Sequence, residues 1–426
     1  MSTKGFGAQE VEEAYSRAHL LSRQVEVTTL LGPVLCGLWN FYLTRANFQQ
    51  AQELAEQLMT LAQKQPEAVM QLQAHNARGQ THLFMGEPAA AQVHIAQGLR
   101  LYNLSAHRHL ATVYGEDPGV VCHKYAALAR WLLGYPAQAA RHLDQGMQLA
   151  QELGSPFGIA QILWGAAVVA QGGRDLRRVD NHTHALVTLC REEGIEIWLA
   201  GGSILQGWAR AYQGQAEEGI ALIRQGVNEL RAGGGELARP HALALLAEAY
   251  GSAGQPNEGL CELTEALAIV DATGERWWEA ELWRIKGELL LQQQSQNAQA
   301  CPERSRRVKA QKAKPGIKNW ELGSGPLPSP SPNPQSQIPD PASETEECFL
   351  KAIDIVRQQQ AKSLELRAVT SLVRLRRQQA TDPGSRSTLT EAHQMLSEIY
   401  NWFTEGFETK DLQEAKTLLD SLESGV

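Results

Sequence analysis

Aromatic side chains recur along this sequence of 426 residues at positions suited to holding another polypeptide segment. Trp131, Trp208 and Tyr212 each combine a large apolar surface with a polar tip, so a groove lined by them would grip an apolar or extended peptide. The alternative is that each aromatic fills the core between long helices. The complete set of candidate groove residues is Asn76, Gln80, Phe84, Lys124, Trp131, Trp208 and Tyr212.

A second set of polar residues lies in a loop, residues 103–119, that interrupts an otherwise regular spacing. Its candidate binding residues are His107, Arg108, His109 and Asp117. Loops that interrupt repeats often carry binding chemistry. His107 and His109 could converge on one ligand, but no carboxylate or cysteine is obviously placed with them. The other interpretation is a simple connection between two repeats.

Residues that would carry catalysis do not occur in the combinations that catalysis needs. His182 and His184 are two positions apart and point to different sides of a helix, which makes a poor metal pair. No Ser, His and Asp set stands out, and no GxxxxGK[ST] phosphate loop occurs. No two of the six cysteines lie within four positions, so no CxxC motif exists. The sequence therefore predicts a protein that is not an enzyme, with no metal and no cofactor.

The composition favours a helical protein of the cytoplasm. Hydrophobic residues make up 43% and the formal net charge is −8. Long runs of Ala, Leu, Gln and Glu favour helix, and alternating runs of Val, Ile and Thr are scarce. The acidic balance argues against nucleic acid or an anionic membrane as partner, since both require a basic surface. No cleavable apolar leader and no run of eighteen apolar residues is present, so we expect a cytoplasmic location with reduced thiols.

An internal repeat is visible in the glycines. A small residue is followed seven positions later by a turn residue and five positions after that by another small residue, as in Ala247, Gly254 and Gly259. The turn residues fall at 46, 86, 134, 173, 214 and 254, with spacings of 40, 48, 39, 41 and 40. The weakest copy reads Ala166, Gly173 and Arg178.

This spacing predicts pairs of antiparallel helices. A small residue on the first helix lets the second approach closely, and the turn glycine ends the first helix. Small residues seven apart on the second helix, such as Gly219 and Gly226, return to one face, where the next repeat packs. The pattern is that of tetratricopeptide repeats with lengthened helices. We therefore expect an all-α, right-handed, tetratricopeptide-like solenoid of about eight helix pairs, each of about 40 residues.

The register of the repeat also predicts which residues line the concave groove. Ligands of such arrays lie against the first helices of the pairs. Lining positions should fall three residues before the first small residue, and one, four and five residues after it. The candidate groove residues given above follow from this rule.

One segment departs from the composition of the repeats. Residues 295–343 are rich in Pro, Ser, Gln and Lys, which predicts disorder. Gly287 fits the first helix of a seventh repeat and Phe349 fits its second, so the insertion should occupy the turn near Gln294. The stretch 301–307 resembles a translated interspersed repeat element, and the alternative is a basic docking patch on a tether. The expected domains are repeats over 1–294 with an incomplete first repeat, the insertion over 295–343, and C-terminal helical repeats and a cap over 344–426.

Several segments are similar to those of a family of bacterial signalling proteins. They resemble the C-terminal helical region of adenylate/guanylate cyclase proteins that carry an AAA-type ATPase module. In that family an effector such as a cyclase or kinase comes first, then the ATPase, then a tetratricopeptide array. The similar segments are Asp117–Cys122, Leu132–Pro136, Gly207–Ala209, Gly214–Ile220, Gly274–Leu282, Asn401–Phe407 and Asp411–Lys416.

The resemblance implies a regulatory array with a protein or peptide partner, such as an AAA-type ATPase or cyclase module. We expect an interaction scaffold or sensor that binds this partner in its concave groove as the regulatory arm of a cyclase/ATPase system. The alternative is a truncated, non-catalytic fragment of an adenylate cyclase whose array senses a small-molecule ligand. An enzyme in its own right has little support in the residues.

Overall fold

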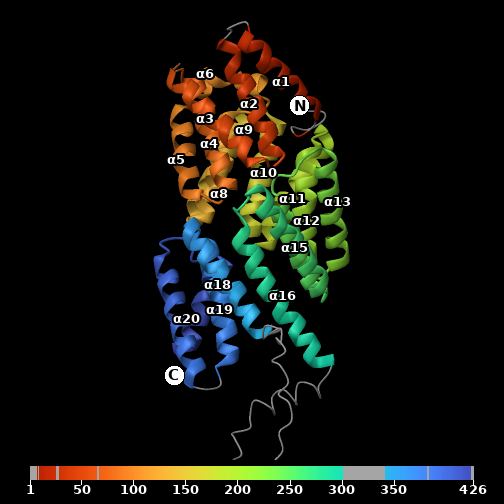
Figure 1. The fold of residues 1–426 in the computed structure, drawn as a ribbon, viewed down its shortest axis with the longest axis vertical. Coiled ribbons are helices and arrows are strands. Elements are labelled where there is room, and N and C mark those ends of the chain that lie inside the picture. The colour runs from red at the N-terminus through yellow and green to blue at the C-terminus, as the bar shows by residue number, and fades with distance from the viewer. Residues whose placement is uncertain are drawn as a thin grey trace, which may run out of the picture.

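The computed structural model describes Gly7 and residues 9–24, 28–64, 67–300, 341–380 and 383–423. Every regular element in these ranges is a helix, and most helices form antiparallel pairs stacked one after another (Figure 1). The pairs are α2 (Thr28–Thr44) with α3 (Phe48–Lys64), α4 (Ala68–Phe84) with α5 (Pro88–Leu101), α8 (Pro118–Leu132) with α9 (Pro136–Glu152), α10 (Pro156–Gly172) with α11 (Leu176–Glu193), α12 (Glu196–Tyr212) with α13 (Ala216–Ala232), α14 (Arg239–Ser252) with α15 (Pro256–Thr273), α16 (Glu279–Ala300) with α18 (Pro341–Gln359), and α19 (Lys362–Gln379) with α20 (Pro383–Trp402).

Four further helices complete the described chain. The single helix α1 (Gln9–Gln24) packs on α2, and α21 (Lys410–Glu423) packs on α19 and α20. Two short helices, α6 (Leu104–His107) and α7 (Leu110–Tyr114), fill the segment between α5 and α8. The prediction of an all-helical, tetratricopeptide-like solenoid is confirmed.

The turns within the pairs require left-handed backbone, which explains the glycines there. Gly86, Gly134, Gly214 and Gly254 have φ between 71° and 91°, and Ala46 has φ 52°. Glycine adopts this conformation without the clash that a Cβ atom introduces. Five of the six predicted turn positions are therefore confirmed.

The sixth turn was predicted one residue too early. Gly173 has φ −78° and ends α10, whereas Arg174 has φ 55° and makes the turn. The register of this repeat shifts with it, because Val179 is fully buried where Arg178 was expected to pack. With the turn at 174 the spacings become 40, 48, 40, 40 and 40, so the period is more regular than the sequence suggested.

The small residues allow close contact, as predicted, but one of them contacts a different neighbour. A Cβ atom on Gly207 would lie 2.6 Å from the Gly219 carbonyl oxygen, so the backbones of α12 and α13 touch here. A Cβ on Gly226 would meet the Ala200 carbonyl oxygen at 2.8 Å and Ile204 at 2.7 Å. Both lie on α12. Gly226 therefore packs within its own helix pair and not against the next pair, as the sequence had suggested.

The array coils back on itself, so that α12–α21 (the second coil) contact the ends of helices in α2–α11 (the first coil). In four successive pairs, a carbonyl at the C-terminal end of the first helix accepts a hydrogen bond from the second coil. Such carbonyls lack the usual partner four residues further along their own helix. The bonds run from Glu236 N and Leu237 N to Thr44 O (2.9 and 3.1 Å), from Arg276 N and Trp277 N to Phe84 O (2.8 and 3.2 Å), from Ser363 Oγ to Trp131 O (2.6 Å), and from Arg367 Nη2 to Gly172 O.

The two helices that flank the predicted insertion form one pair, as expected. Phe349 of α18 is fully buried and lies where a Cβ atom on Gly287 of α16 would be. The boundaries differ from the prediction, because α16 continues past Gln294 to Ala300 and α18 begins at Pro341. Residues 295–299 of this extension are exposed, and Gln296 donates to Gly254 O, in the turn after α14, at 2.9 Å. Residues 301–340 lie outside the described residues.

Candidate functional site

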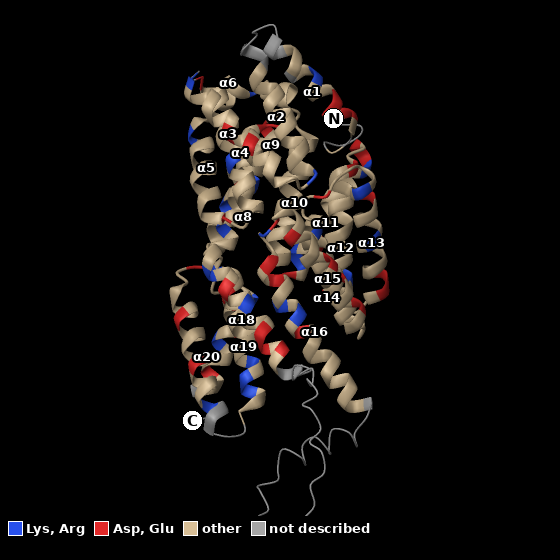
Figure 2. Ribbon diagram, viewed as in Figure 1, with Lys and Arg blue, Asp and Glu red and all other residues tan. Residues whose placement is uncertain are grey.

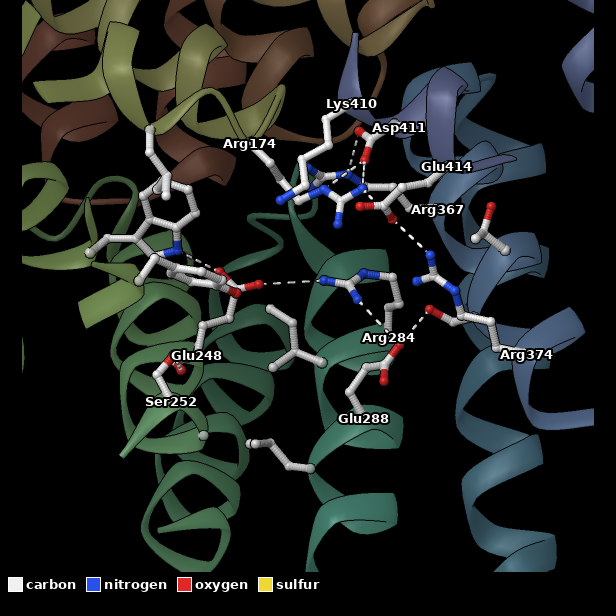
Figure 3. A pocket seen from close by; sticks show the side chains of 18 residues that line it. Arg174, Glu248, Ser252, Arg284, Glu288, Arg367, Arg374, Lys410, Asp411 and Glu414 are labelled. Carbon is white, nitrogen blue, oxygen red and sulfur yellow. Dashed lines mark hydrogen bonds and ion pairs between the residues drawn. The ribbon is translucent and has the colours of Figure 1, made fainter. Parts of the chain in front are cut away.

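The inner faces of five helices enclose a cavity of about 390 Å³. Its walls come from α12, α14, α16, α19 and α21, together with the turn that follows α10 (Figure 3). All but the last helix are first helices of pairs, so the cavity lies on the concave side of the array. Pockets of this size suit a small molecule or a short stretch of chain.

The residues that line the cavity follow the period of the repeat. Trp208, Glu248 and Glu288 occupy the same position on α12, α14 and α16, one residue after the small residue that contacts the paired helix. Tyr212 and Ser252 stand four residues further along their helices. A 40-residue period therefore presents chemically different side chains at equivalent points of one cavity.

Charged residues of both signs gather in the middle of the molecule around this cavity (Figure 2). Glu281 of α16 is 2% exposed and accepts two bonds from Arg284, at 2.9 and 3.0 Å, and one from Arg367, at 3.0 Å. Burial by itself would raise the pKa of Glu281, but the two guanidinium groups outweigh it and the net shift is downward. Glu281 thus stays ionised, and it holds Arg284 and Arg367 in fixed positions.

A second carboxylate continues this network toward the first coil. Asp411 of α21 accepts from Arg367 at 2.9 Å and from Arg174 Nε at 2.7 Å. Burial raises the pKa of Asp411, but the nearby Arg367 and Arg174 lower it by more, so the pKa of Asp411 also lies below its usual value. Glu414, one turn later, bridges Arg174 at 2.9 Å and Arg374 at 2.7 Å. The result is a continuous chain of ion pairs across α16, α19, α21 and the turn after α10.

The opposite wall of the cavity is aromatic and acidic. Trp208 donates from Nε1 to Glu248 at 2.8 Å, and its ring lies 4.7 Å from that of Tyr212. Tyr212 is 41% exposed and faces the open side. Burial raises the pKa of Glu248, and Arg284, 3.5 Å away, partly offsets this. This wall offers a ring surface and carboxylates to a bound group.

Only two of the seven predicted groove residues, Trp208 and Tyr212, line this cavity. The candidate aromatic residues of the earlier repeats contact residues of the second coil. Trp131 stacks on Trp278 with 5.8 Å between ring centroids, and the Phe84 ring meets Trp277 edge-on at 5.7 Å. These aromatics therefore join the two coils, and a binding role for them stays a prediction.

The remaining three predicted groove residues are also buried. Asn76 Oδ1 accepts a bond from Gln80 Nε2 at 3.0 Å, and both side chains are buried. Lys124 is 2% exposed, with its ammonium 4.4 Å from the centre of the Tyr125 ring and 4.8 Å from that of Trp198. Burial lowers the pKa of Lys124 to about 8, while Glu116 acts in the opposite direction. As binding residues all three remain predictions.

The predicted loop residues have structural partners. His107 is buried and its Nδ1 accepts from Asn103 N at 3.1 Å, whereas His109 is exposed. Arg108 donates to the Glu152 carbonyl at 3.0 Å. Asp117 caps α8 by accepting from the backbone N–H groups of its first turn at 2.9 and 3.0 Å. The two histidines do not converge, and a binding role for the four loop residues remains a prediction.

Most of the charged residues of the cavity were not predicted from the sequence. The positional rule for groove residues, applied to the repeats of Ala247 and Gly287, selects Glu248 and Ser252, and Arg284 and Glu288. Charged side chains in a sequence are more often ordinary solvent-exposed surface, so aromatic residues are the stronger signal of a groove. Arg367 and Asp411 lie beyond the insertion, where the repeat pattern is too weak to supply a register.

Within the described residues, no group of three or more His, Cys, Asp or Glu side chains is arranged to hold a metal ion. None of the helices described here combines the length and the apolar character needed to cross a bilayer.

Sequence comparison yields one informative relative. No protein-family model matches the chain. It is 25% identical over 250 residues to an uncharacterized protein of Rhizobium meliloti (strain 1021), a match that covers 58% of this chain. The matched segment is 24% of the relative, so the chain spans about a quarter of that protein's length.

Three solved structures resemble the fold at low sequence identity. The Rap protein complexed with competence and sporulation factor is 9% identical, with a TM-score of 0.49, over 92% of this chain and 98% of its own. Yeast Tom70 is 11% identical, with a TM-score of 0.37, over 93% of this chain and 63% of its own. The third structure is a signal transduction ATPase with numerous domains and a tetratricopeptide repeat sensor, from Pyrococcus horikoshii. It is 11% identical, with a TM-score of 0.38, over 89% of this chain and 54% of its own. The helix pairs described above establish the chain as an all-helical, tetratricopeptide-like solenoid.

Proposed function

We propose that this chain is an interaction array that binds a protein or peptide segment in the cavity formed by α12, α14, α16, α19 and α21. The observation that supports this most directly is the convergence of inner helix faces from four consecutive pairs on one open cavity. Its side chains are fixed by ion pairs beneath the surface, as in the link from Glu281 to Arg284 and Arg367. Pre-ordered polar groups reduce the entropy lost when a flexible partner binds.

The chemistry of the walls favours a polar chain segment over an apolar ligand. Both carboxylates and guanidinium groups line the cavity, and Trp208 and Tyr212 supply an aromatic surface on one side. Peptides carry hydrogen-bonding backbone together with charged and apolar side chains, which matches such a mixed surface. A small polar molecule of similar chemistry is the competing ligand class, and it corresponds to the sensor alternative in the sequence analysis.

The proposal is tested by selecting peptides from a random dodecapeptide display library on the full-length protein. Selected peptides should bind with micromolar or better affinity in fluorescence anisotropy. They should lose that affinity when Ser252, at the mouth of the cavity, is replaced by Trp. Thr264→Trp, on the exposed face of α15, serves as the matched control. A library that yields no peptide sensitive to Ser252→Trp would overturn the proposal.

A more specific proposal is that this array is the regulatory arm of a cyclase/ATPase signalling protein. It rests on the segments of the sequence that resemble the C-terminal helical region of such proteins. It is supported by the length of the relative, of which the matched segment is only a quarter. Co-expression with an AAA-type ATPase module encoded beside this chain should give a co-purifying complex. A neighbouring coding region without any ATPase or cyclase segment, and no complex on co-expression, would remove this assignment and leave the binding proposal intact.

A further inference from the structure

The inference concerns one side of the same cavity and rests on the proposed function. We propose that Arg174, Arg374 and Lys410 (the basic edge) bind an anionic group, a carboxylate or a phosphate, on a side chain of the bound peptide. The three side chains come from the turn after α10, from α19 and from α21, and all three line the cavity (Figure 3).

The charges of the network are balanced overall but divided unevenly across the cavity. On the α14 and α16 side, Glu248, Glu281 and Glu288 surround the single cation Arg284. On the α19 and α21 side, four cations face two carboxylates. These cations are Arg174, Arg367, Arg374 and Lys410, and the carboxylates are Asp411 and Glu414. The second side therefore has an excess of positive charge that a ligand anion would neutralise.

This excess is concentrated where solvent and ligand can reach it. Lys410 is exposed, and no carboxylate of the described residues forms an ion pair with it. Arg374 has a side chain 46% exposed and uses Nη2 for its one ion pair with a described residue, Glu414 at 2.7 Å. Its planar guanidinium has further N–H groups in a fixed fork, a geometry suited to carboxylate and phosphate oxygens.

Within the basic edge, Arg174 is held in place by its partners before a ligand arrives. Arg174 is fixed by Asp411 at 2.7 Å and by Glu414 at 2.9 Å. Asp411 is held in turn by Arg367, which is 7% exposed and also bound to Glu281. Because these supporting ions are hydrogen-bonded and largely buried, the guanidinium of Arg174 loses little freedom on binding.

The opposite wall gives the bound peptide a direction. Tyr212 and Glu248 cannot accept an anionic group favourably, because Glu248 would repel it and no unpaired cation of the described residues stands beside it. An acidic side chain placed at the basic edge lets neighbouring aromatic or cationic side chains reach Trp208, Tyr212 and Glu288. The cavity thus favours peptides in which an acidic residue is separated from an aromatic or basic one.

The test uses the tightest dodecapeptide from the library and two sets of derivatives of it. In one set each acidic residue is replaced in turn by its amide, and in the other by phosphoserine; inorganic phosphate and acetate serve as free competitors. We expect one Asp→Asn or Glu→Gln replacement to weaken binding about tenfold, the scale of a hydrogen bond to a charged group. A phosphoserine that binds more tightly than the acidic residue would identify phosphate as the preferred anion.

Protein variants then locate the anion. Arg374→Gln and Lys410→Gln should each weaken the parent peptide severalfold but leave the amide derivative unaffected, as a double-mutant cycle requires. Arg377→Gln and Lys416→Gln are matched controls on exposed parts of the same helices, and they should change neither peptide. Equal binding of the acidic and amide peptides, or equal effects of cavity and control variants, overturns the inference but not the proposed function. A library without any cavity-dependent peptide overturns both.

Discussion

The Nε of Arg174 lies 2.7 Å from Oδ1 of Asp411, although 237 positions separate the two residues in the sequence. Arg174 belongs to the first coil and Asp411 to the second, so this ion pair closes the array across its inner side. Arg174 also has φ 55°, at a position where the turns of four other pairs have glycine. A non-glycine residue in left-handed conformation carries a strain on the order of 1 kcal/mol, which the contacts of its side chain offset.

Arg367 is the central member of the buried ion-pair network, and its removal should be costly. Arg367→Met leaves Glu281 and Asp411 each without one buried cation, and breaking such a pair costs about 3–5 kcal/mol. The midpoint of urea unfolding, followed by circular dichroism, should fall clearly. Arg377→Met, an exposed change on the same helix, should leave the midpoint nearly unchanged. Equal midpoints for the two variants would contradict the role of the network.

Gly226 should tolerate no large side chain. In Gly226→Leu the new atoms would meet the Ala200 carbonyl, which is backbone of α12 and cannot move alone. We expect a loss of about 1–3 kcal/mol from overpacking, measured as a lower melting temperature. Gly233→Leu is the control, since a Cβ there meets nothing closer than 3.5 Å. A Gly226→Leu protein as stable as the control would show that α12 and α13 separate easily.

Two histidine pairs should make the fold sensitive to acid. His75 and His94 face each other with 3.0 Å between their Nδ1 atoms, and His123 and His142 with 3.3 Å. Burial, and then the neighbouring histidine, lower the pKa of His94 and of His123 to about 4. The unfolded chain binds these protons near pH 6.5, so stability is full above that pH and declines as pH falls toward 4.

The measurement is the melting temperature between pH 4 and pH 8. Combining His94→Gln with His123→Gln should flatten the acid limb of this profile. His184→Gln, on an exposed face of α11, is the matched control. An unchanged acid limb in the double variant would exclude the pairs as its source.

The stability contributed by Glu275 should change with pH in the direction opposite to that of the histidine pairs. It is 1% exposed and accepts bonds from Ala238 N at 3.0 Å and from Trp277 Nε1 at 2.9 Å. Burial, only partly offset by these bonds, raises its pKa to about 8. The folded state therefore keeps a proton that the unfolded chain releases near its ordinary carboxyl pKa, and the stability contributed by Glu275 is lost as pH rises toward 8.

Glu275→Gln keeps an acceptor without a charge, so it should match or exceed the wild-type protein in stability at pH 8. Glu275→Ala leaves two buried donors unpaired and should cost about 1–3 kcal/mol. Urea unfolding at pH 5 and pH 8 separates the two effects. If Glu275→Gln and Glu275→Ala were equally destabilising at pH 8, the neutral acceptor would not be the important feature.

The insertion should be dispensable for the fold. Replacing residues 301–340 with a six-residue Gly/Ser linker should preserve helicity and melting temperature, because α16 and α18 pack directly on each other. Contacts such as Gln294 Nε2 to Thr345 Oγ1 at 3.1 Å remain in this deletion. The wider deletion of 295–343 also removes helical residues and the bond from Gln296 to Gly254 O, so it should be less stable. Loss of the folded state in the narrower deletion would overturn this assignment.

The sequence predicted the helix pairs because local steric rules set them. A turn glycine such as Gly214, and a small residue such as Gly207 at a point of backbone contact, can each be identified without any long-range information. The same rules placed one turn a residue too early, at Gly173. The left-handed position there is occupied by Arg174, whose side chain pairs with the distant Asp411. The cavity was not predictable in the same way. Its position depends on how the array curves, which brings Trp278 of the second coil against Trp131 and leaves Tyr212 partly exposed. The spacing of the repeats does not determine that curvature.

The hydrogen bonds that cap the first-coil helices also bear on how the chain reaches this structure. In an open solenoid each repeat contacts only its neighbours, so folding begins anywhere and spreads. Here the closing contacts join residues 192 to 237 positions apart, such as Arg276 with Phe84, Arg367 with Gly172 and Arg174 with Asp411. These contacts form only after both coils exist, and such non-local pairing slows folding. The last kinetic step should therefore be the docking of two preformed helical halves, and local fraying of one repeat should loosen contacts in another that is remote in the sequence.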